Sequence, residues 1–153
     1  MQHRITKLLR TPMMAWLARG LLTLPFWSSG LSKLFLFDAG VAEMARAGLE
    51  PAAAFNVATI VVQLGGSALV ILNRAAWLGA GALGLFTGLT ILLVHRFWAI
   101  PEEPFRTIAM HVSSEHVGMI GGLIAIAILS ARSGIADDTR HNPALHARSE
   151  ARA

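Results

Sequence analysis

The sequence predicts an all-α protein embedded in a membrane as a four-helix bundle, with both termini in the cytoplasm. The first observation is composition: 54% of the residues are hydrophobic and 14% are charged, whereas about a quarter of the residues are charged in a typical soluble domain. The second is a series of apolar segments close to the roughly 20 residues that a helix needs to cross ~30 Å of hydrocarbon. The third is the recurrence of polar residues within these segments at helical spacing.

Four spans are predicted, over residues 13–37, 52–72, 77–95 and 108–131. They form one membrane domain over residues 13–131. The first span follows a basic leader, residues 1–12, and resembles a signal peptide. Its apolar run of ~25 residues exceeds the 7–15 residues of a signal-peptide core, so we expect an uncleaved span.

The connections between the spans are short. The segment between residues 38 and 51 is expected to contain an interfacial helix, because Val41, Met44 and Leu49 fall near one face. Pro51 suits the first turn of the second span. A tight turn at residues 73–74 makes the second and third spans antiparallel neighbours. Residues 132–153 are polar and are predicted to form a disordered cytoplasmic tail.

The distribution of Lys and Arg predicts the orientation in the membrane. A cytoplasmic N-terminus puts eight of these residues on the inner side: Arg4, Lys7, Arg10, Arg74, Arg132, Arg140, Arg148 and Arg152. Four then lie on the outer side: Lys33, Arg46, Arg96 and Arg106. The high pI, near 11.1, reflects this asymmetry, and no basic run interleaved with aromatic residues indicates a nucleic-acid surface.

Each predicted span carries polar or small residues that share one face of a helix. The stripes are Arg19, Thr23, Phe26, Gly30 and Lys33; Asn56, Thr59, Gln63 and Ser67; Gly84, Gly88 and His95; and His111, Ser114, Glu115, Gly118 and Gly122. We expect all four stripes to face the bundle interior, since polar groups in a membrane avoid lipid. At ~1.5 Å per residue, the titratable side chains converge on the outer half of the bundle.

The polar side chains of these stripes and one interfacial tryptophan are the candidates for ligand binding. They are Arg19, Lys33, Gln63, His95, Trp98, Glu115 and His116. A structural role stays open for several: Lys33 and His95 as interfacial anchors, and Glu115 as the ion-pair partner of Lys33. The glycines are expected to serve helix packing.

No catalytic residue follows from the sequence. The chain has no nucleotide-binding loop and no nucleophile–base pair, so we do not expect an enzyme that acts alone. The absence of cysteine excludes thiolate metal sites and thiol–disulfide chemistry by this chain. His111 and His116 are five residues apart and point ~140° away from each other on a helix, so neither a metal nor a haem is expected.

Several short motifs resemble the DoxX family of bacterial four-helix membrane proteins. They are Ala18-Arg19-Gly20-Leu21, Ser29-Gly30-Leu31-Ser32-Lys33-Leu34, Gly48-Leu49-Glu50-Pro51, Gln63-Leu64-Gly65-Gly66, His95-Arg96-Phe97-Trp98, and Glu115-His116 followed by Gly121-Gly122. The resemblance covers about residues 13–130. The sequence departs from the family at Gln63, where the family often has a glutamate. Any role of that glutamate in proton transfer or ion pairing is therefore in doubt for this chain.

The resemblance implies an integral inner-membrane protein. Family members have been linked to thiosulfate:quinone oxidoreduction and to membrane-bound redox or thiol-stress complexes. By this analogy, the chain is a membrane subunit or accessory factor that binds a small lipophilic molecule such as a quinone. A scaffold or chaperone-like partner without chemistry is the alternative, and a small transporter is a second one. The expected partners are the lipid bilayer and another protein or a second copy of the chain.

Overall fold

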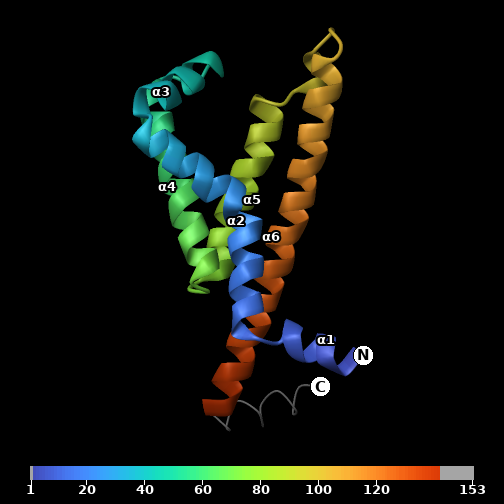
Figure 1. Ribbon diagram of the computed structural model, residues 1–153. Coiled ribbons are helices and arrows are strands. Elements are labelled where there is room, and N and C mark those ends of the chain that lie inside the picture. The colour runs from blue at the N-terminus through green and yellow to red at the C-terminus, as the bar shows by residue number, and fades with distance from the viewer. Residues whose placement is uncertain (1, 142–153) are drawn as a thin grey trace, which may run out of the picture.

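The computed structural model describes residues 2–141, with side chains for residues 2–132, and this part of the chain contains helices and turns but no strand. The helices are α1 (Gln2–Leu9), α2 (Pro12–Phe35), α3 (Phe37–Arg46), α4 (Ala52–Ile71), α5 (Ala76–Leu93), the 3₁₀ helix η1 (Phe97–Ala99) and α6 (Phe105–His141). The all-α prediction is confirmed. Figure 1 shows that α2, α4, α5 and α6 run lengthwise, while α3 lies across one end.

Helix α2 has a clear start and a bend. Thr11 caps it, because the Thr11 Oγ1 accepts a hydrogen bond from the Met14 N–H at 3.4 Å, and Pro12 occupies the first turn. Pro25 lies inside the helix. A proline there removes one backbone hydrogen bond and kinks the helix. The half of α2 that leads to α3, called the outer half after the predicted orientation, accordingly leans away from α6 in Figure 1.

The expected short helix after the first span is confirmed as α3. Met44 and Gly40 are buried on its inner side. A Cβ atom on Gly40 would collide with the Asn56 side chain, and the Asn56 Nδ2 donates to the Phe37 carbonyl at 3.3 Å. This close approach holds α3 against the outer part of α4.

Helices α4 and α5 approach each other through two glycines. A Cβ atom added to Gly79 would lie 2.6 Å from the Gly66 carbonyl oxygen, and one added to Gly66 would lie 2.8 Å from Leu83 Cγ. The turn between these helices uses the left-handed region at Asn73, where φ is 53°. Asn73 Oδ1 also accepts a hydrogen bond from Ser130 Oγ at 3.2 Å, which ties the turn to α6.

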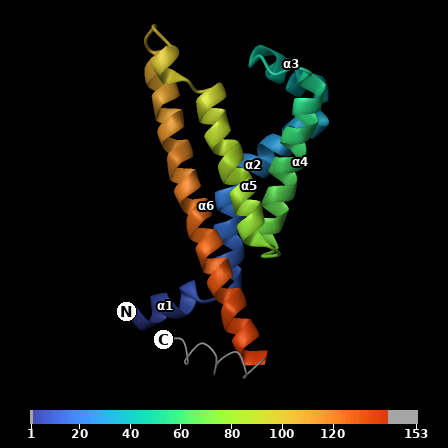
Figure 2. The ribbon, with the colours of Figure 1, turned by 180° about the vertical axis from the view of Figure 1, so that it is seen from behind.

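The packed core occupies the half of the molecule that lies away from α3. Its buried side chains are Phe26, Val70, Ala80, Leu83 and Leu123. Leu22 packs against this cluster and would be touched by a Cβ atom on Gly122 at 2.8 Å, so α2 meets α6 here. Towards the end that carries α3, α2 and α4 diverge from α5 and α6, as Figures 1 and 2 show from opposite sides.

Three helices have the length and composition to cross a membrane. These are the segments Ala52–Ile71, Ala76–Ala99 and Phe105–Arg132, which match the predicted spans over 52–72, 77–95 and 108–131. Helix α2 coincides with the predicted span over 13–37. It is not among the helices that are apolar enough to cross a membrane. A fourth span, and with it a four-span bundle, stays a prediction.

Two of the four predicted stripes face the interior. Thr23, Phe26 and Gly30 are buried on α2, and the whole stripe of α4, residues Asn56, Thr59, Gln63 and Ser67, is buried. The prediction for α6 is wrong, because His111, Ser114, Glu115 and Gly118 are exposed. On α5, the buried side is formed by Ala76, Gly79, Ala80, Leu83 and Thr87 rather than by Gly84 and Gly88, which are half-buried.

The end of the chain also differs from expectation. Helix α6 continues to His141, so residues 132–141, assigned to the disordered tail, are helical. The remainder of that tail, residues 142–153, lies outside the described residues.

Candidate functional site

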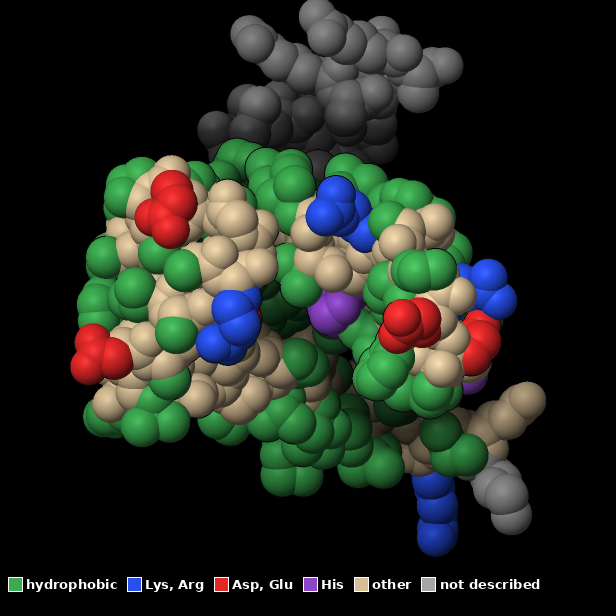
Figure 3. Space-filling view, turned by 90° about the horizontal axis from the view of Figure 1, so that it is seen from above, with side chains coloured by type: hydrophobic (Ala, Val, Ile, Leu, Met, Phe, Trp, Pro, Cys, Tyr) green, Lys and Arg blue, Asp and Glu red, His purple; other side chains and the backbone are tan. Residues whose placement is uncertain are grey.

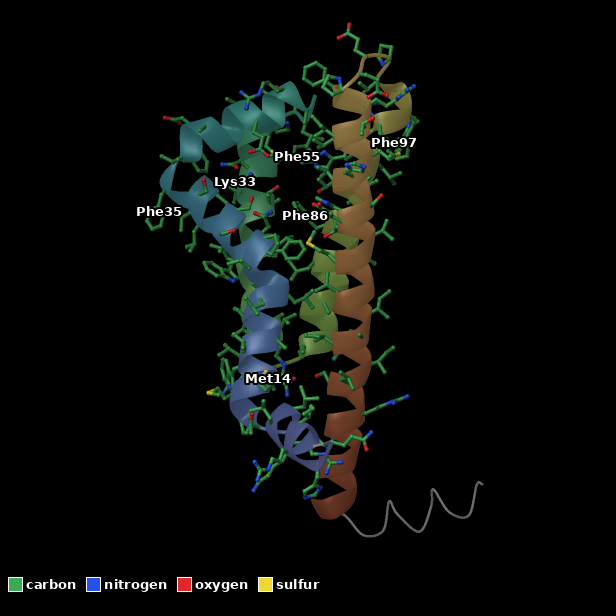
Figure 4. All side chains as sticks on the ribbon, turned by 45° about the vertical axis from the view of Figure 1, so that its right-hand side comes forward. Met14, Lys33, Phe35, Phe55, Phe86 and Phe97 are labelled. Atoms are coloured by element: carbon green, nitrogen blue, oxygen red, sulfur yellow. The ribbon has the colours of Figure 1, made fainter. Side chains whose placement is uncertain are left out.

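The divergence of the helices encloses a cleft of about 790 Å³ in the half of the molecule that carries α3. Its walls come from α2, α3 and α4 on one side and from α5 and α6 on the other. Phe55 of α4 and Phe86 of α5 both line it and lie between the two walls in Figure 4. The view from above shows a hollow between two halves of the surface, with a histidine at its edge (Figure 3).

Four of the seven candidate residues line this cleft: Lys33, Gln63, His95 and His116. They come from α2, α4, the connection after α5, and α6, and are separated by up to 83 positions in the sequence, so only the tertiary structure brings them together. The expectation that titratable groups of different spans converge is met for these residues, while their placement on the outer side of the membrane stays a prediction.

Lys33 forms an ion pair with Glu43 of α3. The Lys33 Nζ lies 2.8 Å from Glu43 Oε2 and 3.3 Å from Ser29 Oγ. Only 11% of the Lys33 side chain is exposed, against 54% for Glu43. The expectation that Lys33 pairs with Glu115 is therefore wrong, because the break between α2 and α3 brings a nearer carboxylate to the lysine.

Gln63 supplies a hydrogen-bonding group at the wall of the cleft. It is 5% exposed, and its Oε1 has no hydrogen-bond partner among the described residues. Along the same face of α4, Thr59 Oγ1 donates to Met44 Sδ at 3.9 Å. A buried amide oxygen without a partner is costly in a low-dielectric surrounding, so a polar group of a bound molecule would relieve this cost.

His95 and His116 contact each other at the α5–α6 wall. Their ring centroids are 5.1 Å apart, with an edge-to-face angle of 66°. The His116 Nδ1 lies 2.8 Å from the Val112 carbonyl oxygen, so this nitrogen carries the proton and donates. Ser113 Oγ donates to the His95 carbonyl at 3.1 Å, which fixes the end of α5 against α6.

Positive charge predominates around the cleft. The lining contains three cations, Lys33, Arg46 and Arg96, but a single carboxylate, Glu43. Glu43 is engaged by Lys33, while neither Arg46 nor Arg96 has an ion-pair partner within the part of the chain that the structure describes. Lys and Arg side chains accordingly flank the hollow in Figure 3. Such a mouth attracts hydrogen-bond acceptors and anions.

Three site residues were missed at the sequence level: Glu43, Arg46 and Arg96. Their only sequence signal was position. All three lie in the connections at the outer ends of the predicted spans, where a charged residue is normally assigned to the membrane interface.

The other three candidates lie away from the cleft. Arg19 is half-buried in the inner half of α2, where its carbonyl accepts a hydrogen bond from Thr23 Oγ1 at 2.7 Å. Trp98 is 56% exposed and stacks edge-to-face on Phe97, beside a shallow pocket at the outer tip. Glu115 is exposed on α6, next to His116 in sequence but not part of the lining. Within the described residues, no three His, Asp or Glu side chains are grouped to hold a metal ion.

Comparison with known proteins identifies one family. The DoxX family profile matches residues 14–96, from α2 through the end of α5, and thus includes most of the cleft lining. Neither the curated proteins nor the solved structures contain a significant match to the chain. Since the matched segment covers more than half of the 153 residues, and the apolar helices are those of a multi-pass membrane protein, this protein belongs to the DoxX family.

Proposed function

We propose that this membrane protein binds a small lipophilic molecule with a polar head in the outer cleft, as a membrane subunit or accessory factor of a redox or stress-related complex. The observation that carries the proposal is the cleft itself. Its volume of about 790 Å³ falls within the 300–1,000 Å³ that is common for ligand sites, and its lining combines aromatic residues with a few polar groups, as such sites do.

The lining supports a particular type of head group. Lys33, Arg46, Arg96 and the histidines offer N–H donors, so the head should accept hydrogen bonds, as the carbonyl oxygens of a quinone do. The Gln63 amide can meet a second polar atom at the wall. Phe55 and Phe86 would contact the ring or tail of the molecule.

The chain contributes binding rather than redox chemistry. It has no cysteine, which excludes thiol redox chemistry by this chain, and we expect a partner protein to supply any electrons to a bound quinone. In this role the donors around the cleft would orient the quinone carbonyls, and the apolar walls would exclude water from them.

The test is binding of a decyl-tailed quinone to the purified protein in dodecyl maltoside, measured by calorimetry and by the rise in melting temperature. Ala58 lines the cleft, so Ala58→Trp should fill it and abolish binding. Val61, on the same helix, is 63% exposed and is not part of the lining, so Val61→Trp is the matched control. No saturable binding to the unmodified protein, with a soluble protein co-purifying in fixed ratio, would favour the scaffold alternative instead.

A further inference from the structure

A stripe of polar and small residues runs along the exposed side of α6, beside exposed apolar residues such as Val117 and Ile124 and ahead of Leu129. The residues of the stripe are His111, Ser114, Glu115, Gly118, Gly121 and Ala125, and all six are exposed. The buried side of α6 is formed by Ala109, Ser113 and Leu123. Glu115 and Ser113 lie ~160° apart around the helix, so the carboxylate faces outwards. In Figures 1 and 2, α6 forms an edge of the molecule.

This outer stripe lies at a depth where lipid would surround it. The apolar part of α6 is Phe105–Arg132. At ~1.5 Å per residue, Glu115 lies about 5 Å from its middle, well within the ~15 Å half-thickness of the hydrocarbon. Ionisable residues at such depths face protein or water and have partners. Among the described residues, neither Glu115 nor His111 has a hydrogen-bond or ion-pair partner.

The glycines of the stripe are not explained by packing within one chain. A Cβ atom added to Gly118 or to Gly121 would have no neighbour within 4 Å. By contrast, a Cβ atom on Gly122, the residue after Gly121, would collide with Leu22 of α2. Small residues on a membrane helix allow the backbone of a second helix to come close. Gly118 and Gly121 are therefore suited to a helix that belongs to another molecule.

We propose that this outer stripe of α6 is the interface between two copies of the chain, related by a two-fold axis along the membrane normal. A two-fold contact requires a surface that complements itself. Glu115 offers an acceptor, and His111, one turn away on the same face, offers a donor. Because side chains lean towards the N-terminus of their helix, the Glu115 carboxylate reaches towards the level of the partner's His111. In such a dimer each Glu115 carboxylate would find a donor, His111, on the other copy, and the contact would occur twice.

The natural absence of cysteine allows a direct test. Ser114→Cys and Gly118→Cys are each oxidised in native membranes with copper phenanthroline, and the products are separated without reductant. The expected result is a disulfide-linked species of twice the 16.4 kDa chain mass. Val61→Cys, also at an exposed position but on α4, should remain monomeric. Monomers at both α6 positions, or equal cross-linking at Val61, would overturn the proposal.

A second measurement separates a specific contact from random collision. Two-colour energy transfer in liposomes reports the dimer fraction at fixed protein-to-lipid ratio. Glu115→Leu should weaken association at least ten-fold, while Glu115→Gln, which can still hydrogen-bond, should retain most of it. Neither change should lower the melting temperature of the monomer in detergent, since the side chain lies outside the core. An unchanged dimer fraction for Glu115→Leu would refute the role of this face.

Discussion

Lys33 at the outer end of α2 and Glu43 on α3 are joined by an ion pair of 2.8 Å that closes the corner between these two helices. The chain breaks its helix at Leu36, where ψ is 58°, and turns back so that residues ten apart come into contact. The pair also forms part of the cleft wall. It therefore links the position of α3, which covers one end of the cleft, to the helix that forms its side.

We expect the Lys33–Glu43 pair to show coupling in a double-mutant cycle. Lys33→Met and Glu43→Gln should each destabilise the protein, and the double variant should lose less than their sum, with a coupling of about 0.5–1 kcal/mol because Glu43 is half exposed. Thermal unfolding in detergent measures it. Lys33→Met combined with Glu115→Gln is the control and should be additive. Coupling in the control alone would contradict the observed pairing.

The α4–α5 contact should not tolerate a side chain at Gly79. A Cβ atom there would lie 2.6 Å from the Gly66 carbonyl oxygen, and backbone cannot shift as cheaply as a flexible side chain. Gly79→Ala should destabilise by about 1–3 kcal/mol, the usual cost of overpacking. Gly81→Ala, on the same helix with no atom within 4 Å of the new Cβ, should be neutral or slightly stabilising. Equal melting temperatures for the two variants would contradict this packing.

Gln63 should contribute to binding but not to stability. Its Oε1 is buried without a partner, and replacing an unsatisfied polar group by an apolar one of similar shape is neutral or stabilising. Gln63→Met should thus melt at or above the temperature of the unmodified protein. Quinone affinity should fall about five- to ten-fold, which corresponds to the ~1 kcal/mol of one hydrogen bond. Val61→Met is the control that should change neither value.

The start of α6 should loosen at acidic pH. Hydrogen bonds from Thr107 and from Arg106 lower the pKa of the Glu103 carboxyl below its usual 4.5, and the same carboxylate accepts the Thr107 backbone N–H at 3.2 Å. A lowered pKa in the folded state means that the ionised form stabilises the fold above pH 4.5 and that this contribution is lost as the pH falls through the lowered value. Amide exchange at Thr107, corrected for intrinsic rates, should therefore lose protection below pH 4.5. Glu103→Gln should remove this pH dependence.

The helices and the α4 face could be predicted from the sequence because their signals are strong and local. Asn56, Gln63 and Ser67 are polar side chains in an otherwise apolar segment, and turning them to lipid is costly, so their direction follows from composition. No such signal exists on α5, where glycines are small without being polar.

On α6, polar residues follow one another in the chain. Ser113, Ser114, Glu115 and His116 point in four directions ~100° apart, and composition alone does not indicate which of them face inwards. The structure turns Ser113 and His116 inwards and Ser114 and Glu115 outwards. The partner of Lys33 could not be predicted from the sequence either, because the ion pair depends on the angle between α2 and α3.

Orientation in the membrane is the last prediction, and it follows from charge. In the predicted topology eight Lys and Arg residues flank the inner ends of the spans and four flank the outer ends, and the cytoplasmic side retains the excess of positive charge. A fluorescent reporter fused after Ala153 should fluoresce, whereas alkaline phosphatase at the same position should be inactive. Phosphatase inserted after Gly48, in the α3–α4 connection, should be active, because that connection lies at the opposite end. An active phosphatase at Ala153 would reverse the topology and place the mouth of the cleft, with Arg46 and Arg96, in the cytoplasm.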